Sequence, residues 1–220
     1  MKKRISIIGG GVSGLGAALL AKSKNNYVFL SEKNQLNNKT KQILKSNGIN
    51  YEEGHHSKTL LSSDLIIKSP GISDDSLIVK QIKDKGVSII SEIEYGFENT
   101  DSKIIAVTGT NGKTTTCLML KHIFNQTALN VLLAGNVGNS LCYELSLKNN
   151  YDIIVLEVSS FQLENINKFQ PDISVILNIS DDHLDRYSNF NEYRMSKFMI
   201  TKNQKKEDYL IYNYDDKFLK

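Results

Sequence analysis

A lysine and a threonine at the end of a glycine-rich turn are the residues of this chain best suited to phosphate chemistry. Residues 106–116 read Ala-Val-Thr-Gly-Thr-Asn-Gly-Lys-Thr-Thr-Thr and lie between an apolar run and a helical pattern. In such a loop the backbone amides and the helix dipole bind phosphate, the lysine reaches the terminal phosphates and the threonine hydroxyl can ligate Mg²⁺. The pattern predicts a nucleoside triphosphate site made by Gly109, Thr110, Asn111, Gly112, Lys113, Thr114 and Thr115.

One position departs from the common form of this loop. The full pattern has a glycine six residues before the lysine, and here that residue is Val107. A glycine-rich turn with an incidental lysine is the alternative, but the placement of Gly-Lys-Thr between a strand and a helix disfavours it. We therefore interpret the loop as a shortened relative of the common phosphate loop.

Two polar segments follow later apolar runs and are expected at the same sheet edge. Glu157 ends the run 152–157, where Mg²⁺ would need a second protein oxygen; the alternative is a capping or surface glutamate. His183 stands among three aspartates and Arg186 and is a candidate metal ligand or phosphate contact. Asn136, in Ala-Gly-Asn-Val-Gly, either donates into the cleft or belongs to a structural loop. Lys197, taken alone, reads as a solvated lysine on a helix.

The N-terminal glycine cluster predicts a second nucleotide site. Gly9, Gly11 and Gly14 fit the G-x-G-x-x-G pattern between a strand and a helix, and Glu32 stands where a ribose-binding acid would be. Read alone, the pattern indicates NAD or FAD, although a tight turn with exposed amides accepts any diphosphate. Ser69 and Gly71 follow a later strand and either line the same crevice or form a structural turn.

Short apolar runs alternate with helical patterns along the chain, which predicts an α/β fold with parallel sheets. The expected strands span residues 5–8, 27–30, 64–68, 87–90, 103–108, 130–134, 152–157, 173–178 and 208–212. The expected helices span residues 13–24, 39–47, 76–84, 113–124, 139–147 and 190–202. The polar stretch 98–102 reads as a linker. We expect a Rossmann-like domain at 1–98 and a truncated P-loop ATPase-type α/β domain at 99–220.

The composition excludes several classes of protein. A hydrophobic fraction of 40% and a charged fraction of 23% are ordinary for a globular protein of one large or two small domains. The net charge of +3 comes from scattered lysines and does not indicate nucleic-acid binding. No segment approaches the ~20 apolar residues that span a bilayer. Cys117 and Cys142 lack metal-ligand spacing, and two cysteines in a chain of this size do not suggest a disulfide scaffold, which favours the reducing cytoplasm.

Together these motifs resemble the Mur ligases, the ATP-dependent amide-forming enzymes of peptidoglycan and cell-wall synthesis. The loop at 108–115 matches the ATP motif of that family. Within the family, the string Glu-Val-Ser-Ser-Phe-Gln-Leu-Glu at 157–164, Ser-Pro-Gly-Ile at 69–72 and His-Leu-Asp-Arg at 183–186 are similar to the branch that adds D-glutamate. The resemblance runs from Ile5 to about Asp216.

The resemblance implies a role for each candidate residue. Lys113 and Thr114 would hold ATP and one Mg²⁺, with Glu157 as the carboxylate ligand. His183 would serve a second Mg²⁺ and the substrate carboxylate, and Lys197 matches a lysine that the family carbamylates. Lys113, His183 and Lys197 would then be the catalytic residues. The UDP-MurNAc-L-alanine site would include Val12, Ser13, Glu32, Ser69, Asn136 and His183.

The implied reaction transfers a phosphoryl group from ATP to the alanyl carboxylate, and the amine of D-glutamate then attacks the acyl phosphate. Lys113 and the two metal ions would neutralise the developing charge. We expect a cytoplasmic monomer that is shorter than the family norm and inactive by itself. The alternative is a non-catalytic module that binds ATP or a UDP-sugar. An NAD-dependent enzyme is disfavoured because it leaves the second phosphate loop unexplained.

Overall fold

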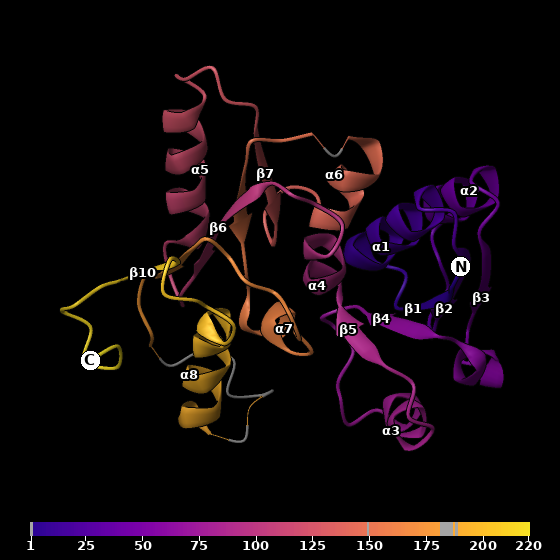
Figure 1. Ribbon diagram of the computed structural model, residues 1–220. Coiled ribbons are helices and arrows are strands. Elements are labelled where there is room, and N and C mark those ends of the chain that lie inside the picture. Colours follow the sequence, from indigo (N-terminus) through magenta and orange to yellow (C-terminus); the bar gives the residue numbers. More distant parts are fainter. Residues whose placement is uncertain (1, 149, 181–186, 188) are drawn as a thin grey trace. The chain divides into compact units, whose positions relative to one another are not determined.

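The computed structural model describes residues 2–148, 150–180, 187 and 189–220, which form two α/β units (Figure 1). The first unit comprises residues 1–99 and 140–148, and the second comprises residues 100–139 and 149–220. The chain therefore leaves the second unit for one short segment and then returns to it.

The first unit is built on a parallel sheet with the strand order β3-β2-β1-β4-β5. Its strands are β1 (Arg4–Ile8), β2 (Tyr27–Glu32), β3 (Asn50–Glu53), β4 (Leu65–Lys68) and β5 (Ile89–Ser91). The strand order reverses at β1, which lies between β2 and β4. Ligands of open parallel sheets bind beyond the carboxyl ends of the strands at such a point, so the glycine loop after β1 stands in the expected place.

Helices cover this sheet and bring a distant segment to it. They are α1 (Val12–Ser23), α2 (Asn38–Ser46), α3 (Leu77–Asp84), α4 (Glu92–Phe97), α6 (Leu141–Leu147) and the 3₁₀ helix η1 (Lys58–Ser62). Helix α6 packs against α1 and α4. The approach is close at Gly16, where an added Cβ would lie 2.3 Å from Ser140 Oγ.

The second unit has a parallel sheet with the order β10-β9-β6-β8-β7. Its strands are β6 (Lys103–Thr108), β7 (Val131–Gly135), β8 (Ile153–Glu157), β9 (Ile173–Ile176) and β10 (Tyr209–Tyr212). The helices are α5 (Lys113–Phe124), α7 (Ser160–Leu163), α8 (Phe190–Phe198) and the 3₁₀ helix η2 (Met199–Thr201). The phosphate loop follows the central strand, β6, whose neighbours are β8 and β9.

The predicted parallel α/β fold is confirmed. Sequence patterns missed β3, an edge strand that reads Asn-Tyr-Glu-Glu, because it has no apolar run. They also missed α4, which is too short for a helical period to show. Helix α6 groups with the first unit, whereas the sequence division placed its residues in the second. The reason is the packing of α6 on α1 and α4; the domain boundary at 98/99 itself stays a prediction.

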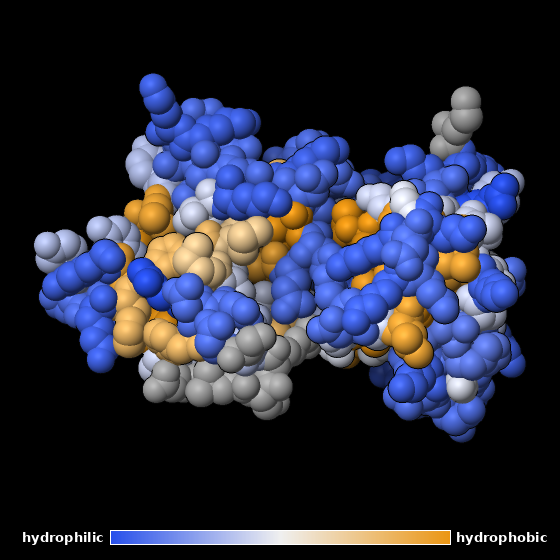
Figure 2. Space-filling model, turned by 90° about the horizontal axis from the view of Figure 1, so that it is seen from below, coloured by the Kyte–Doolittle hydropathy of each residue, from blue (hydrophilic) through white to orange (hydrophobic). Residues whose placement is uncertain are grey.

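The surface view in Figure 2 is mainly hydrophilic, with separate hydrophobic areas. In the second unit, large apolar side chains face solvent on α5, at Leu118, Met119 and Ile123, and along the whole of β10. Every helix within the described ranges is too short or too polar to cross a lipid bilayer.

A buried carboxylate at the start of α4 helps to fix α6. Glu92 is 2% exposed, and its Oε1 accepts a hydrogen bond of 2.6 Å from the backbone N–H of Cys142. Its Oε2 is buried and has no hydrogen-bond partner in the described part of the chain. Burial raises the pKa of Glu92 to about 7, against the hydrogen bonds from Cys142 and Ser140, which lower it. The folded protein therefore favours a protonated Glu92.

We predict that Glu92 makes the first unit less stable as pH rises. Its pKa is higher in the folded state, so its contribution is fully present below pH 4.5 and is lost as pH rises through about 7. The loss amounts to about 3 kcal/mol in the free energy of unfolding. Glu92→Gln should abolish this dependence in denaturant titrations at several pH values, while Glu98→Gln, at an exposed position on the C-terminal side of the same helix, should keep it. Equal pH profiles for wild type and Glu92→Gln would contradict the prediction.

Candidate functional site

The glycines of the phosphate loop adopt conformations that other residues rarely reach. Gly109 has φ +150° and Gly112 has φ +82°, and Gly112 is the residue that precedes helix α5. A Cβ at Gly109 would also lie 3.1 Å from the Cβ of Leu177, on the segment after β9. These two positions let the chain turn sharply from β6 into α5, so that the helix N-terminus faces the loop.

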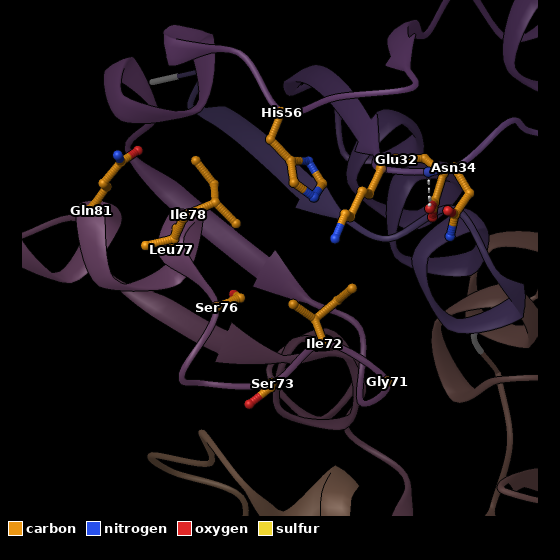
Figure 3. A pocket seen from close by; sticks show the side chains of 11 residues that line it. Glu32, Asn34, His56, Gly71, Ile72, Ser73, Ser76, Leu77, Ile78 and Gln81 are labelled. Carbon is orange, nitrogen blue, oxygen red and sulfur yellow. Dashed lines mark hydrogen bonds between the residues drawn. The ribbon is translucent and has the colours of Figure 1, made fainter.

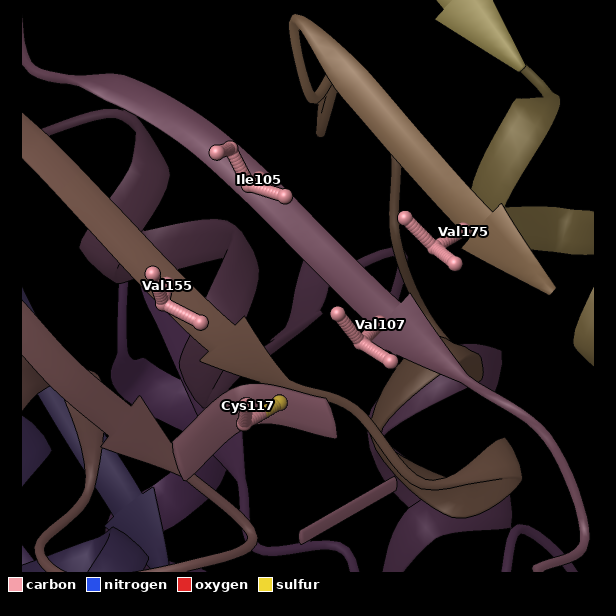
Figure 4. Packing of buried hydrophobic residues seen from close by; sticks show 5 residues of the cluster. All are labelled: Ile105, Val107, Cys117, Val155 and Val175. Carbon is pink, nitrogen blue, oxygen red and sulfur yellow. The ribbon is translucent and has the colours of Figure 1, made fainter. Parts of the chain in front are cut away.

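Val107 replaces the first glycine of the common loop because the strand continues through that position. It is fully buried and packs with Ile105, Cys117, Val155 and Val175 between the sheet and α5 (Figure 4). Val107 also pairs with Glu157 across β6 and β8. The turn begins only after Thr108, and the loop is shorter for that reason.

The segment after β9 fixes the backbone of the loop. Asn178 Oδ1 accepts a 2.9 Å hydrogen bond from the N–H of Asn111, and its Nδ2 donates to Asn111 O at 3.1 Å. The Asn178 carbonyl also accepts from the N–H of Thr110. The sequence reading did not select Asn178. A polar residue just beyond a strand that neighbours the loop strand was the available signal.

Two lysines meet at one carbonyl of the loop. Lys113 Nζ donates to Gly109 O at 2.9 Å and to Thr110 O at 2.8 Å. Lys197, on α8, is 2% exposed and donates to the same Gly109 O at 2.9 Å. Its Nζ also lies 4.5 Å from the centroid of the Tyr193 ring, whose hydroxyl lies 3.1 Å from Thr110 Oγ1. Lys197 is therefore a buried residue of the loop's surroundings and not the solvated lysine that its sequence context suggested.

Glu157 joins three elements at the edge of the sheet. Its carboxylate is 1% exposed; Oε2 accepts from Thr114 Oγ1 and Oε1 accepts from Asn136 Nδ2, both at 2.8 Å. The backbone N–H of Asn136 also donates to Glu157 O at 2.9 Å. Residue 135 is a glycine for a steric reason, because a Cβ there would lie 2.2 Å from Glu157 O. Thr114, Asn136 and Glu157 thus form one hydrogen-bonded cluster.

The string that follows Glu157 turns the chain away from the sheet. Ser159 and Gln162 form a capping box at α7: the N–H of Ser159 donates to Gln162 Oε1 at 3.0 Å, and the N–H of Gln162 donates to Ser159 Oγ at 3.4 Å. These reciprocal bonds fix the chain two residues after the carboxylate. The Ser-Ser-Phe-Gln segment therefore helps to fix the backbone that follows Glu157.

The predicted metal ligands are brought together only in part. Thr114 and Glu157 are in contact, while Lys197 bonds to Gly109. His183 lies outside the described residues. Over residues 2–148, 150–180, 187 and 189–220, histidine, cysteine, aspartate and glutamate side chains form no group of three or more that could hold a metal ion. Among the described residues, the predicted metal ligands that are in contact are one carboxylate, Glu157, and one hydroxyl, Thr114.

The two cysteines are not poised for nucleophilic chemistry. Both are buried. Burial raises the pKa of the Cys117 thiol to about 12, with a further contribution from Glu157, and burial raises the pKa of Cys142 well above its ordinary value. Thiols of this kind act as small core residues.

The glycine loop of the first unit is closed by tight contacts. Gly9 has φ +98°, and a Cβ there would lie 2.7 Å from Ser69 Oγ; a Cβ on Gly14 would lie 1.8 Å from Gly9 O. Glu32 Oε2 accepts the N–H of Gly10 at 2.6 Å, and its Oε1 accepts the N–H of Asn34 at 2.8 Å. Glu32 therefore stabilises the loop itself, whatever further contact it makes.

A cavity of about 510 Å³ opens beside this loop (Figure 3). Its wall includes Glu32 and Gly71 from the sequence reading, and also His56, which that reading missed. Ser69 contacts the glycine loop, whereas Val12, which is 62% exposed, and Ser13 do not line the cavity. His56 had no sequence signal because it follows a polar edge strand.

A buried lysine, Lys68, fixes the segment after β4 that forms part of the cavity wall. Lys68 is 2% exposed; its Nζ donates to Ile72 O at 2.6 Å and lies 2.9 Å from Asp74 Oδ1. Lys83 pairs with the other carboxylate oxygen of Asp74 at 2.8 Å. These bonds hold the Ser-Pro-Gly-Ile turn as a defined wall and not as a loose connection.

Two family models match the chain. The Mur ligase middle domain matches residues 107–220, and the MurD N-terminal domain matches residues 4–78. The first match covers more than half of the chain, and it includes the phosphate loop, Glu157 and Lys197.

Curated relatives match over nearly the whole chain. The UDP-N-acetylmuramoylalanine--D-glutamate ligase of Bacteroides fragilis is 46% identical over 220 residues, which are 99% of this chain and 49% of that protein. The enzyme of the same name from Porphyromonas gingivalis is 43% identical over 221 residues, with 100% and 49% covered. The chain thus spans about half the length of the curated relatives it matches.

Solved structures support the fold. The UDP-N-acetylmuramate-alanine ligase MurC of Thermotoga maritima gives a TM-score of 0.61 at 26% identity, over 98% of this chain and 50% of that one. A UDP-N-acetylmuramate:L-alanyl-gamma-D-glutamyl-meso-diaminopimelate ligase from Neisseria meningitides gives a TM-score of 0.69 at 22% identity. The match covers 100% of this chain and 74% of that one. The second likeness bears on the fold alone.

We predict that the Thr114 hydroxyl is needed to stabilise the buried Glu157. Thr114→Val keeps the side-chain shape but removes one of the two side-chain donors to this carboxylate. The loss should cost about 1–3 kcal/mol in the free energy of unfolding. Thr115→Val is the matched control, because Thr115 is exposed and its hydroxyl has no hydrogen bond within the described residues; it should stay within about 0.5 kcal/mol of wild type. Chemical denaturation measures both, and equal stabilities would contradict the prediction.

Proposed function

Since the chain belongs to the Mur ligase family, we propose that it provides the nucleotide-binding part of a peptidoglycan ligase that adds D-glutamate to UDP-MurNAc-L-alanine at the expense of ATP. The reaction class follows from the resemblance of the motifs and from the names of the matching relatives. The alternative is a module that binds these nucleotides without catalysis.

The observation that carries the proposal is the cluster at Glu157. A buried carboxylate beside a phosphate loop is costly unless it is hydrogen-bonded, and here Thr114 and Asn136 supply those bonds. Oxygen ligands of this kind suit Mg²⁺. The residues therefore fit a divalent cation that accompanies a nucleoside triphosphate.

In the proposed reaction the loop binds the phosphates of ATP through Gly109, Thr110, Asn111, Gly112 and Thr115, together with Lys113 and Thr114. Lys113 would stabilise negative charge on the phosphoryl group as it moves to the alanyl carboxylate. The amine of D-glutamate would then attack the acyl phosphate, with loss of phosphate and formation of the amide.

Thr114 and Glu157 would hold one Mg²⁺, and His183 and a carbamylated Lys197 would serve a second. Bound Mg²⁺ supplies charge neutralisation at the phosphates. A neutral lysine that takes up CO₂ becomes an anionic oxygen donor, which suits Mg²⁺ better than an ammonium group does.

The first unit would bind the UDP portion of the substrate. Its cavity and the loops at Gly9 and Ser69 support this part of the proposal, with Val12, Ser13 and Glu32 as contacts. Asn136 and His183 would contact the substrate as well. We further propose a cytoplasmic protein that acts as a monomer, without nucleic-acid or membrane partners.

We predict that the chain binds UDP and UDP-MurNAc-L-alanine in preference to NAD. Isothermal titration calorimetry of the 220-residue chain with each ligand measures the preference directly. Binding of NAD but not of the uridine nucleotides would refute the ligase proposal. The first unit would then be a dinucleotide-binding domain.

We also predict that Lys113→Ala abolishes ATP binding and leaves UDP binding unchanged. The lysine belongs to the loop of the second unit, while the proposed UDP site lies in the first. Lys121→Ala, farther along the same helix, should bind both nucleotides like wild type. Loss of UDP binding in Lys113→Ala, with the variant still folded, would refute separate sites.

A further inference from the structure

The cavity of the first unit has a mixed wall that suits a flat polar ring. Ile72, Leu77 and Ile78 supply apolar surface, and the ring of His56 points into the space between these residues and Glu32 (Figure 3). A volume of about 510 Å³ falls within the range of small-molecule sites. The polar atoms that face this space therefore decide which ring it accepts.

A chain of hydrogen bonds fixes the tautomer of His56. Ser31 Oγ lies 2.6 Å from Glu52 Oε1 and 2.6 Å from His56 Nδ1. Burial works to raise the pKa of Glu52, but hydrogen bonds from Ser31 and Ser57 outweigh it and hold that pKa below its ordinary value, so the carboxylate only accepts. The Ser31 hydroxyl must donate to Glu52, and His56 Nδ1–H must then donate to Ser31. The other ring nitrogen, Nε2, is left as an acceptor.

The surroundings keep His56 neutral. Burial lowers the pKa of His56 below its ordinary value. The charges of Glu32 and Glu52 raise this pKa, and those of Lys33 and His55 lower it. At neutral pH the neutral form dominates, and Nε2 has no hydrogen-bond partner within the part of the chain that the structure describes.

A second polar group of the wall is also unused. Ser76 lines the cavity at the start of α3, and its Oγ is buried without a hydrogen-bond partner among the described residues. Although Ser76 occupies the capping position, its side chain makes no capping bond. Since the Ser76 oxygen is closed off from solvent, the fixed acceptor of the cavity is His56 Nε2, beside the further polar lining residues Lys33, Asn34, Ser73 and Gln81.

We infer that His56 is the residue that selects the base of the nucleotide, accepting the N3–H of uracil at Nε2. The N3–H of an imide edge is a donor, and it is the complement of the acceptor at Nε2. Cytosine in the same pose would place the lone pair of its N3 against that of Nε2. This inference rests on the proposed function, because it takes the occupant to be a uridine nucleotide.

The test compares UDP and CDP, which carry the same ribose and phosphates. Calorimetry of the wild-type chain at neutral pH should give about tenfold tighter binding of UDP than of CDP, the value of one good hydrogen bond and its loss. Equal affinities would overturn the role of His56 and leave the proposed function standing. No binding of UDP at all would overturn the proposed function and this inference with it.

Two substitutions separate recognition from folding. His56→Asn places an amide near the position of Nδ1, so it can still donate to Ser31, but it has no group at Nε2. We expect it to remain folded in thermal melts and to bind UDP and CDP with equal affinity. His56→Gln can reach the position of Nε2 with an acceptor oxygen, and it should keep part of the preference. Full discrimination in His56→Asn would overturn the inference.

A pH series needs no variant. Protonation puts a hydrogen on Nε2, so the preference for UDP over CDP should shrink as pH falls from neutral to about 5. Protonation of the terminal phosphate affects both ligands alike and cancels in the ratio. A ratio that does not change over this range would count against His56 as the acceptor.

Discussion

The second unit depends on the cost of burying one carboxylate. Glu157 is 1% exposed at the end of β8, and its two oxygens are satisfied by Thr114 from the first turn of α5 and by Asn136 from the loop after β7. An unpaired carboxylate there would cost several kcal/mol, so the helix and both strands must keep their relative positions. The close approach at Gly135 and the capping box after Glu157 serve the same arrangement. This constraint also fixes the end of the phosphate loop, because the hydrogen bond from Thr114 to Glu157 sets the position of the first turn of α5.

The two glycine loops use different side chains to accept hydrogen bonds from their backbone N–H groups. Both leave backbone N–H groups at a turn between a strand and a helix, and both satisfy some of them from a neighbouring strand end. In the first unit the partner of Gly10 is the carboxylate of Glu32, whose negative charge disfavours a second anion at that amide. In the second unit the partner of Asn111 is the neutral amide of Asn178. This difference agrees with the proposal that the triphosphate binds at the second loop and that the base of the UDP portion binds in the cavity beside the first.

The sequence predicted what depends on local pattern, and it failed where long-range packing decides. Apolar runs gave the strands around both loops, and Gly-Lys-Thr gave the loop itself. In the sequence, Val107 is only a departure from the common loop. The reason for the valine is its packing against Cys117 of α5, and this contact is visible only in the three-dimensional core. Lys197 could be selected only through family resemblance, because its burial beside Tyr193 leaves no local trace. His56 was missed for the same reason: a lone histidine becomes informative only when the structure places it in the wall of a cavity.

The meeting of Lys113 and Lys197 at Gly109 bears on the proposed carbamylation. Each Nζ lies 2.9 Å from the same carbonyl oxygen, so the two nitrogens are no more than about 6 Å apart, where two positive charges repel each other appreciably. The carbonyl and the Tyr193 ring favour a cation on Lys197, whereas its burial and the neighbouring ammonium group oppose one. Carbamylation would resolve this conflict at little structural cost. The carbamate nitrogen keeps one N–H, so the hydrogen bond to Gly109 can persist, while the second positive charge disappears and an anionic oxygen donor takes its place. The two lysines differ in burial and not in their distance to Gly109: Lys197 is 2% exposed and Lys113 is only partly buried, which agrees with the proposal that Lys197 is the lysine that is modified.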